Sequence, residues 1–133
     1  MFETIGVKTS SRIEMIDITD RIANYISKQK IKSGLCCLFV PHTTAGITIN
    51  ENADYSVQLD INSKLSELII AHDNKYSHLE GNSDSHIKTT VVGQSLNIII
   101  ENGKPVLGTW QGIFFCEFDG PRNRNLHIKI VEG

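Results

Sequence analysis

The sequence predicts an α+β fold: a mainly antiparallel β-sandwich with two principal helices and one short helix packed against it. Short segments of alternating or continuous apolar residues recur along the chain, as expected for strands. Two other segments carry apolar residues at helical spacing. Beyond residue 94 the pattern contains only strand and turn signals. Helices laid on an antiparallel sheet bury both kinds of apolar face, which leads to this class.

Four strands are expected in the first half of the chain. Residues 2–9 form the first, and residues 12–16 form the second with alternating polarity. The run LCCLFV at 35–40 is apolar on both faces, which is typical of a central strand. Residues 45–50, AGITIN, complete this set.

Caps and apolar stripes locate the helices. Thr19 is expected to cap the first principal helix, and Asn52 or Asp54 the second. The second helix carries one apolar stripe, which consists of Val57, Ile61, Leu65, Leu68 and Ile69. Asp84 is expected to cap a short helix that Gly93 stops, although residues 89–92 would also suit a strand.

Strand and turn signals alternate in the last third of the chain. Residues 95–100 form a strand, and Asn102-Gly103 predicts a tight hairpin because both turn positions need positive φ. Pro105 should lie early in the returning strand or on a sheet edge, since it has no N–H to donate. Residues 113–118 are apolar on both faces and hence buried, whereas residues 126–131 alternate and leave one face wet.

Length and composition favour one soluble domain that spans residues 1–133. Apolar residues make up 40% and charged residues 21% of the chain, which is typical of a globular protein. The formal net charge of −2 argues against a nucleic-acid partner, which usually requires a basic stripe. We expect no membrane partner, because no apolar run approaches the roughly 20 residues that span a bilayer. The first residues also lack the pattern of a signal peptide.

Cysteine usage indicates a reducing compartment. Cys36, Cys37 and Cys116 are odd in number and two of them are adjacent, which does not suggest a disulfide framework. We interpret all three as small buried apolar side chains. Cytoplasmic residence is therefore the expected location.

The segment HDNKYSHLEGNSDSHIK, at 72–88, is the most informative part of the chain. It carries three histidines among carboxylates and has almost no apolar residues. Such a segment is costly to bury, and long irregular segments in compact domains are often functional. His78, Glu80 and His86 are the candidates for metal or phosphate binding and proton transfer. His72 is interpreted as a solvated loop residue.

Pro41-His42-Thr43-Thr44 follows the predicted central strand directly, where a rigid scaffold can support a site. The imidazole of His42 could bind a metal or an anion or carry a proton, and the two hydroxyls could donate to phosphate oxygens. The alternative is a turn completed by Thr43 and Thr44 beside a satisfied core histidine.

Two further segments join strands to other elements. In Asn50-Glu51-Asn52-Ala53-Asp54, one side chain would cap the following helix, which leaves Glu51 unexplained. In GTWQG at 108–112, the glycines fit a bulge that lets a backbone or ligand approach, or else a corner with Trp110 in the core. Gln111 would offer both a donor and an acceptor.

Arg122 follows a turn at Asp119-Gly120-Pro121 and could bind phosphate or carboxylate through two hydrogen bonds. A solvated surface arginine is the alternative.

Several motifs in a fixed order resemble a known family. They are HTTAGITINENAD at 42–54, YSHLEG at 76–81, HIK at 86–88, GQSL at 93–96, GTWQGI at 108–113 and DGPR at 119–122. As a set, over nearly the whole chain, they resemble the YjbQ-like family, also called the secondary thiamine-phosphate synthase enzyme family. One departure is that Asn82, Ser83 and Ser85 stand where members often carry proline or a small apolar residue.

The resemblance implies a single-domain sandwich assembled as a homotrimer. It also implies a thiamine-phosphate-synthase-like activity, in which an aminopyrimidine diphosphate joins a thiazole phosphate and releases pyrophosphate. The family label describes a secondary activity, so the main physiological role stays open. The pocket residues implied by the family pattern are His42, Thr43, Asn50, Glu51, Asp54, His78, Glu80, His86, Gln111 and Arg122.

The leading hypothesis is a metal-assisted enzyme that acts on a phosphorylated small molecule. His42, His78 and His86 would bind a divalent ion, with zinc the first choice for nitrogen-rich ligation. The substrate would be bound by Thr43, Thr44, Asn50, Gln111 and Arg122. The acid and base would come from Glu51, Glu80 and Asp54. One alternative is a non-catalytic binding protein for a phosphorylated metabolite or metal, and another is that the histidine loop serves a subunit boundary.

Overall fold

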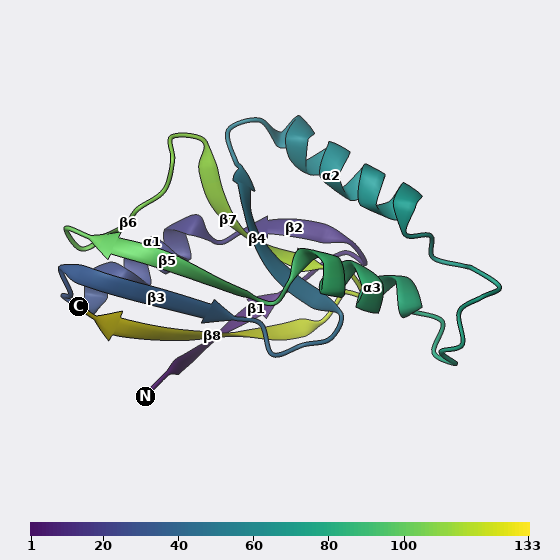
Figure 1. Ribbon diagram of the computed structural model, residues 1–133, viewed down its shortest axis with the longest axis horizontal. Helices are drawn as coiled ribbons and strands as arrows, with labels where there is room; N and C mark the ends of the chain where they lie inside the picture. Colours follow the sequence, from purple (N-terminus) through teal and green to yellow (C-terminus); the bar gives the residue numbers. More distant parts are fainter.

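The computed structural model describes residues 1–133 as eight strands and three helices (Figure 1). The strands are β1 (Glu3–Lys8), β2 (Glu14–Asp17), β3 (Ser33–Phe39), β4 (Ala45–Glu51), β5 (Ser95–Glu101), β6 (Lys104–Pro105), β7 (Gln111–Glu117) and β8 (Asn123–Glu132). The helices are α1 (Thr19–Lys28), α2 (Tyr55–Leu68) and α3 (Ser83–Val92). This content confirms the predicted α+β class. No helix is long and apolar enough to cross a membrane.

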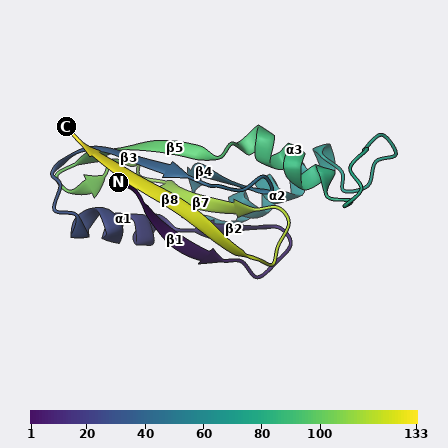
Figure 2. The same ribbon diagram turned by 90° about the horizontal axis from the view of Figure 1, so that it is seen from below.

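The strands form two antiparallel sheets. The larger has the order β1-β8-β3-β5-β6, and the smaller has the order β2-β7-β4. β3 lies in the middle of the larger sheet, as the apolar run at 35–40 predicts, and β7 lies in the middle of the smaller one. In Figure 2, α1 lies at one end of the stacked strands, and α2 and α3 lie at the other.

Two apolar clusters hold the layers together. The larger cluster includes Ile22 of α1, Leu38 of β3 and Phe115 of β7, all fully buried. The smaller cluster is formed by alternate residues of β7, including Phe114, with side chains of α2 and α3 such as Leu65 packed against it. The smaller sheet is therefore covered on both faces, and residues 113–118 are buried as predicted.

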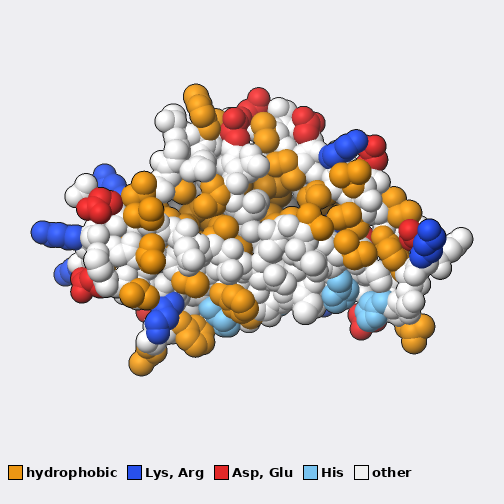
Figure 3. Space-filling model, viewed as in Figure 1, with side chains coloured by type: hydrophobic (Ala, Val, Ile, Leu, Met, Phe, Trp, Pro, Cys, Tyr) orange, Lys and Arg blue, Asp and Glu red, His pale blue; other side chains and the backbone are white.

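The outer face of the larger sheet is apolar and uncovered. Leu35 and Phe39 of β3 are 48% and 47% exposed, although a strand with two apolar faces was expected to be buried on both. Leu35 pairs with Ile99 of β5 on one side and with Val131 of β8 on the other, and both are more than half exposed. Apolar side chains accordingly gather over β3, β5 and β8 in Figure 3.

Two of the three predicted helix caps, at Thr19 and Asp84, are wrong, and the third is formed by Asp54, one of its two candidates. Thr19 is the first residue of α1 after the cap position, and its N–H donates to the Asp17 carboxylate instead. Asp54 rather than Asn52 caps α2, accepting from the Ser56 N–H at 2.9 Å. Asp84 lies inside the first turn of α3, fully buried.

Asp84 is buried because two cations reach it. Arg12 lies 3.0 Å and Lys88 3.3 Å from its carboxylate oxygens. Burial raises the pKa of Asp84, but hydrogen bonds and charge from the two cations outweigh it and hold the pKa below its usual value. The buried Asp84 carboxylate thus joins α3 to the partly exposed Arg12 in the loop after β1.

The glycine and proline predictions are confirmed. Asn102 and Gly103 have φ of 54° and 72° and join β5 to β6. Pro105 lies on the edge strand β6. Gly93, with φ of 97°, ends α3, and residues 89–92 belong to this helix rather than to a strand.

Candidate functional site

A pocket of about 840 Å³ opens where the loop after β3 meets the segment before α3 and the start of β8. Seven of the predicted site residues line it: His42, Thr43, Thr44, His78, Glu80, His86 and Arg122. Arg124 and Asn82, which were not predicted, line it as well. The structure thus brings together segments that lie about eighty residues apart in sequence, His42 and Arg122 among them.

The other four predicted residues do not reach this pocket. Asn50, Glu51 and Gln111 lie where β4 and β7 pair at their far end, and Asp54 caps α2 just beyond. The pocket end of the same pair is Ala45 opposite Glu117. Six residue steps along a strand correspond to about 20 Å. Within one chain, these four residues and the pocket therefore lie at opposite ends of the same strand pair.

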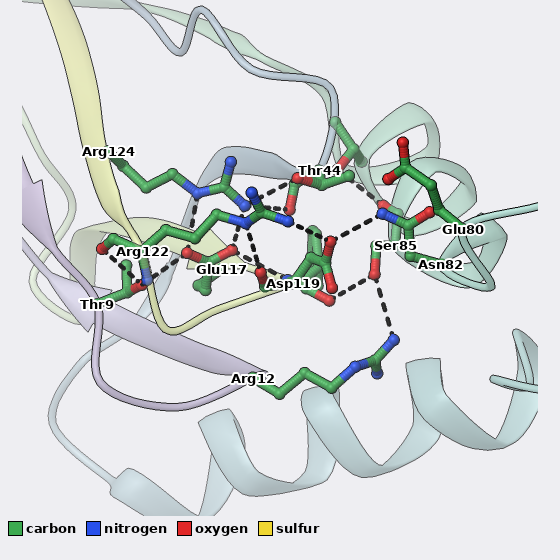
Figure 4. A network of polar contacts seen from close by, with 12 residues as sticks. Thr9, Arg12, Thr44, Glu80, Asn82, Ser85, Glu117, Asp119, Arg122 and Arg124 are labelled. Atoms are coloured by element: carbon green, nitrogen blue, oxygen red, sulfur yellow. Dashed lines mark hydrogen bonds and ion pairs between the residues drawn. The ribbon is translucent and has the colours of Figure 1, made fainter.

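The pocket's most rigid cation is Arg124. Its side chain is 5% exposed, and its Nε donates to Glu117 at 2.9 Å, while Nη2 donates to Glu117 and to the Thr44 hydroxyl at 2.8 Å. These bonds leave Nη1 without a protein partner, and Figure 4 shows it pointing away from the Glu117 carboxylate. A guanidinium held in this way can bind an anion without losing side-chain entropy.

The Glu117 carboxylate is the fixed counter-charge. Burial raises its pKa, but hydrogen bonds from Arg124, Thr9 and the Asp119 N–H outweigh that effect and hold the pKa below its ordinary value. Glu117 is therefore ionised at neutral pH. The sequence contains a signal for each residue. The alternation of β8 extends back from Leu126 to Arg124 and places Arg124 on the inward face. Glu117 is a carboxylate within a buried apolar run, where it needs a partner.

His42 is held in one tautomer. Its Nε2 accepts a hydrogen bond from the Asn125 N–H at 2.9 Å, which requires a neutral ring with the proton on Nδ1. Burial lowers the pKa of His42, and the charge of Arg124 lowers it further. His42 therefore offers an N–H donor, and its Nε2 lone pair is already in use.

Arg122 is more exposed than Arg124 and is held by one carboxylate. Its Nε donates to the Asp119 backbone oxygen at 2.8 Å, and its Nη2 lies 2.9 Å from the Asp119 carboxylate. Asn82 donates to the same carboxylate oxygen at 2.8 Å, as Figure 4 shows. Asp119 thus links the start of α3 to the arginine, and the predicted turn at 119–121 is also a positioning element.

The two remaining histidines lie across the pocket entrance. The rings of His78 and His86 meet edge to face with centroids 5.3 Å apart, and His78 Nε2 lies 4.0 Å from the exposed Glu80 carboxylate. No group of three or more histidine, cysteine, aspartate or glutamate side chains is arranged to hold a metal ion. The structure therefore shows no three-histidine metal site, and zinc binding by His42, His78 and His86 stays a prediction.

The GTWQG segment forms neither a ligand pocket nor a core corner. Trp110 is 63% exposed, and its backbone oxygen accepts from the Asn52 N–H at 3.1 Å. A Cβ on Gly112 would lie only 2.4 Å from the Asn52 amide nitrogen, so glycine is needed for this contact. The close approach predicted for the segment is thus made by a side chain of the same subunit.

The fold and pocket define a small α+β protein with a basic, histidine-rich cleft. The chain belongs to the YjbQ-like family, because the family model described as UPF0047 protein YjbQ-like matches residues 3–133. It is 59% identical to the UPF0047 protein MJ1081 of Methanocaldococcus jannaschii over 94% of this chain and 90% of that protein. It is 47% identical to the UPF0047 protein YugU of Bacillus subtilis, over 98% of this chain and 99% of that one.

Solved structures show the same fold. A YjbQ/UPF0047-family protein of Clostridium acetobutylicum superposes with a TM-score of 0.94 at 48% identity, covering 97% of this chain and 99% of that chain. A protein of unknown function from Sulfolobus solfataricus superposes with a TM-score of 0.93 at 34% identity, covering 100% and 97%. These likenesses confirm the family and the fold.

Proposed function

We propose that the pocket binds the diphosphate or phosphate group of a small molecule and that the protein has a thiamine-phosphate-synthase-like activity. One observation carries the proposal: Arg124 is buried and ion-paired, yet keeps Nη1 free beside the pocket. Arg122 and the Nδ1–H of His42 add two more donors on the same wall. Three converging donors suit a polyvalent anion better than a carboxylate.

In the proposed reaction, the thiazole nitrogen attacks the methylene carbon of the aminopyrimidine diphosphate. A C–N bond forms, the C–O bond to the diphosphate breaks, and pyrophosphate leaves with the electron pair. Arg122 and Arg124 would stabilise the charge that develops on the leaving group. Glu80 is the one predicted acid–base carboxylate in the pocket and can exchange protons with water or ligand there.

A second candidate is a binding protein that performs no turnover. It is favoured by the position of Glu51 and Asp54, two of the three predicted acid–base residues, outside the pocket of their own subunit. A pocket with donors and one exposed carboxylate can bind a phosphorylated metabolite without reacting with it.

Calorimetry and mass spectrometry separate the two. We expect binding of pyrophosphate, aminopyrimidine diphosphate and thiazole phosphate, and formation of thiamine phosphate when both substrates are present. Arg122→Ala should weaken pyrophosphate binding about tenfold, whereas Lys28→Ala, which removes an exposed charge from α1, should not. Binding without product favours the second candidate, and no binding at all rejects both.

Zinc, cytoplasmic residence and the homotrimer stay predictions. Elemental analysis of the purified protein tests zinc directly. For the trimer, the exposed apolar residues Leu35, Phe39, Ile99 and Val131 provide support, because monomers seldom leave such a face open.

A further inference from the structure

Thr9 carries a buried hydroxyl that lies behind the wall of the pocket and does not line the pocket itself. It follows β1 directly and is 3% exposed. Alternate residues of β1, Ile5 and Val7, pack in the apolar core, and the same alternation brings Thr9 to the inward face. An apolar side chain would be expected at such a position. The reason for a hydroxyl there must therefore lie in its contacts.

The Thr9 hydroxyl acts on Arg124 through the Glu117 carboxylate. Its Oγ1 donates to Glu117 Oε1 at 2.7 Å, and the same carboxylate oxygen accepts from Arg124 Nε at 2.9 Å. The other carboxylate oxygen accepts from Arg124 Nη2 and from the Asp119 N–H. Each oxygen is thus bound by two donors, as Figure 4 shows, and Thr9 fixes the one that orients the Arg124 Nε.

The same hydroxyl holds the backbone of Arg122. Thr9 Oγ1 accepts from the Arg122 N–H at 2.8 Å, and the Thr9 N–H donates to the Arg122 backbone oxygen at 2.9 Å. These bonds extend the pairing of β1 with β8 by one residue beyond Lys8 and Asn123. The preceding turn is so close that a Cβ on Gly120 would lie 2.9 Å from Thr9 Oγ1, so glycine is needed there. Thr9 therefore fixes the point from which the Arg122 side chain projects.

One hydroxyl thus controls where two guanidinium groups stand relative to each other. Arg122 and Arg124 are two positions apart in an extended chain, so their side chains project to the same side, and both line the pocket. A diphosphate has two phosphoryl groups and can engage both cations, whereas one arginine can bind a monophosphate through two parallel hydrogen bonds. The relative position of the two arginines consequently matters more for a diphosphate than for a monophosphate.

We propose that Thr9 is a positioning residue that makes the pocket prefer a diphosphate to a monophosphate, because its hydroxyl holds Arg122 and Arg124 in fixed relative positions. The inference rests on the phosphate-binding function proposed above. A purely structural explanation is that the hydroxyl only satisfies the buried Glu117 carboxylate and stabilises the fold. Loss of the hydroxyl would then lower stability without changing the ratio of the affinities for the two anions. That ratio therefore separates the two explanations.

Calorimetry with pyrophosphate and with inorganic phosphate measures the ratio. Thr9→Val keeps the shape of the side chain but removes the hydroxyl, and it should weaken pyrophosphate binding about tenfold and phosphate binding less than about threefold. Thr9→Ser keeps the hydroxyl and should retain the wild-type ratio. Thr4→Val is the matched control: it removes from the same strand an exposed hydroxyl that lies 2.8 Å from His127 Nδ1 of β8, and it should change neither affinity. Thr9→Ala serves the same comparison if the valine variant does not fold.

Each outcome of the titrations decides something. Equal weakening of both anions in Thr9→Val, or no weakening at all, would overturn the role of Thr9 and leave the phosphate pocket in place. A wild-type protein that binds neither anion would instead reject the proposed function, and this inference with it.

A second measurement needs no ligand. Hydrogen exchange of the Arg122 backbone amide should accelerate at least about tenfold in Thr9→Val, because this N–H loses its acceptor, and should stay slow in Thr9→Ser. Unchanged exchange in Thr9→Val would show that the hydroxyl does not hold Arg122, and the proposal would be wrong whatever the pocket binds.

Discussion

β3 and β7 have the same apolar pattern on both faces, yet only β7 is covered on both. Residues 113–118 lie between the larger sheet and the helices α2 and α3. β3 buries Cys36 and Leu38, while Leu35 and Phe39 on the opposite face remain about half exposed. The comparison teaches that an apolar pattern predicts that a face will be covered, but not whether the cover belongs to the same chain.

The largest effect is expected on the covered strand. Phe114→Ala should lower the free energy of unfolding by about 4 kcal/mol, because its fully buried ring packs against the helix side of β7. Urea denaturation measures this as a lower midpoint with an unchanged slope. Phe39→Ala on β3 is the matched control and should cost much less within an isolated subunit. Equal losses would mean that β3 is as well covered as β7.

Removal of the buried counter-charge should have the next largest effect. Glu117→Gln leaves Arg124 without its partner in a buried position, which should cost about 3 kcal/mol of unfolding free energy. Adding Arg124→Met should restore part of the loss, because an apolar side chain needs no counter-charge. A double variant that is less stable than Glu117→Gln would show that Arg124 contributes through its bonds to Thr44 rather than through charge.

Acid should remove part of the stability through the same carboxylate. The folded pKa of Glu117 lies below its ordinary value of 4.5, so the unfolded chain binds the proton more readily. The stabilisation is therefore complete above pH 4.5 and is lost as the pH falls through the folded pKa. Denaturation between pH 6 and pH 3 should show a steeper loss in the wild type than in Glu117→Gln. Parallel curves would assign the acid sensitivity to other carboxylates, such as Asp84.

The sequence predicted the elements better than the contacts between them. Strand positions and the Asn102-Gly103 turn follow from local pattern and φ requirements, which act within a few residues. The pairing of Asp84 with Arg12, across 72 positions, depends on the fold and leaves no local mark. The motifs did not indicate that the predicted residues occupy two separate locations, because the length of β4 that separates Thr44 from Glu51 in space becomes visible only in the fold.

The smallest effect on subunit stability is expected on the uncovered face of β3, where the change should appear in assembly instead. Leu35→Ser replaces a half-exposed side chain that faces Ile99 and Val131. It should change the unfolding free energy of the isolated subunit by less than about 1 kcal/mol, because little of the side chain is buried there. In light scattering at micromolar concentration it should shift the protein toward the monomer, because in the proposed assembly a second copy would cover this face. Glu132→Gln, an exposed change on neighbouring β8, should leave both quantities unchanged. An oligomer that persists in Leu35→Ser, or a wild type that is already monomeric, would mean that this face of β3 is covered by something other than a second copy.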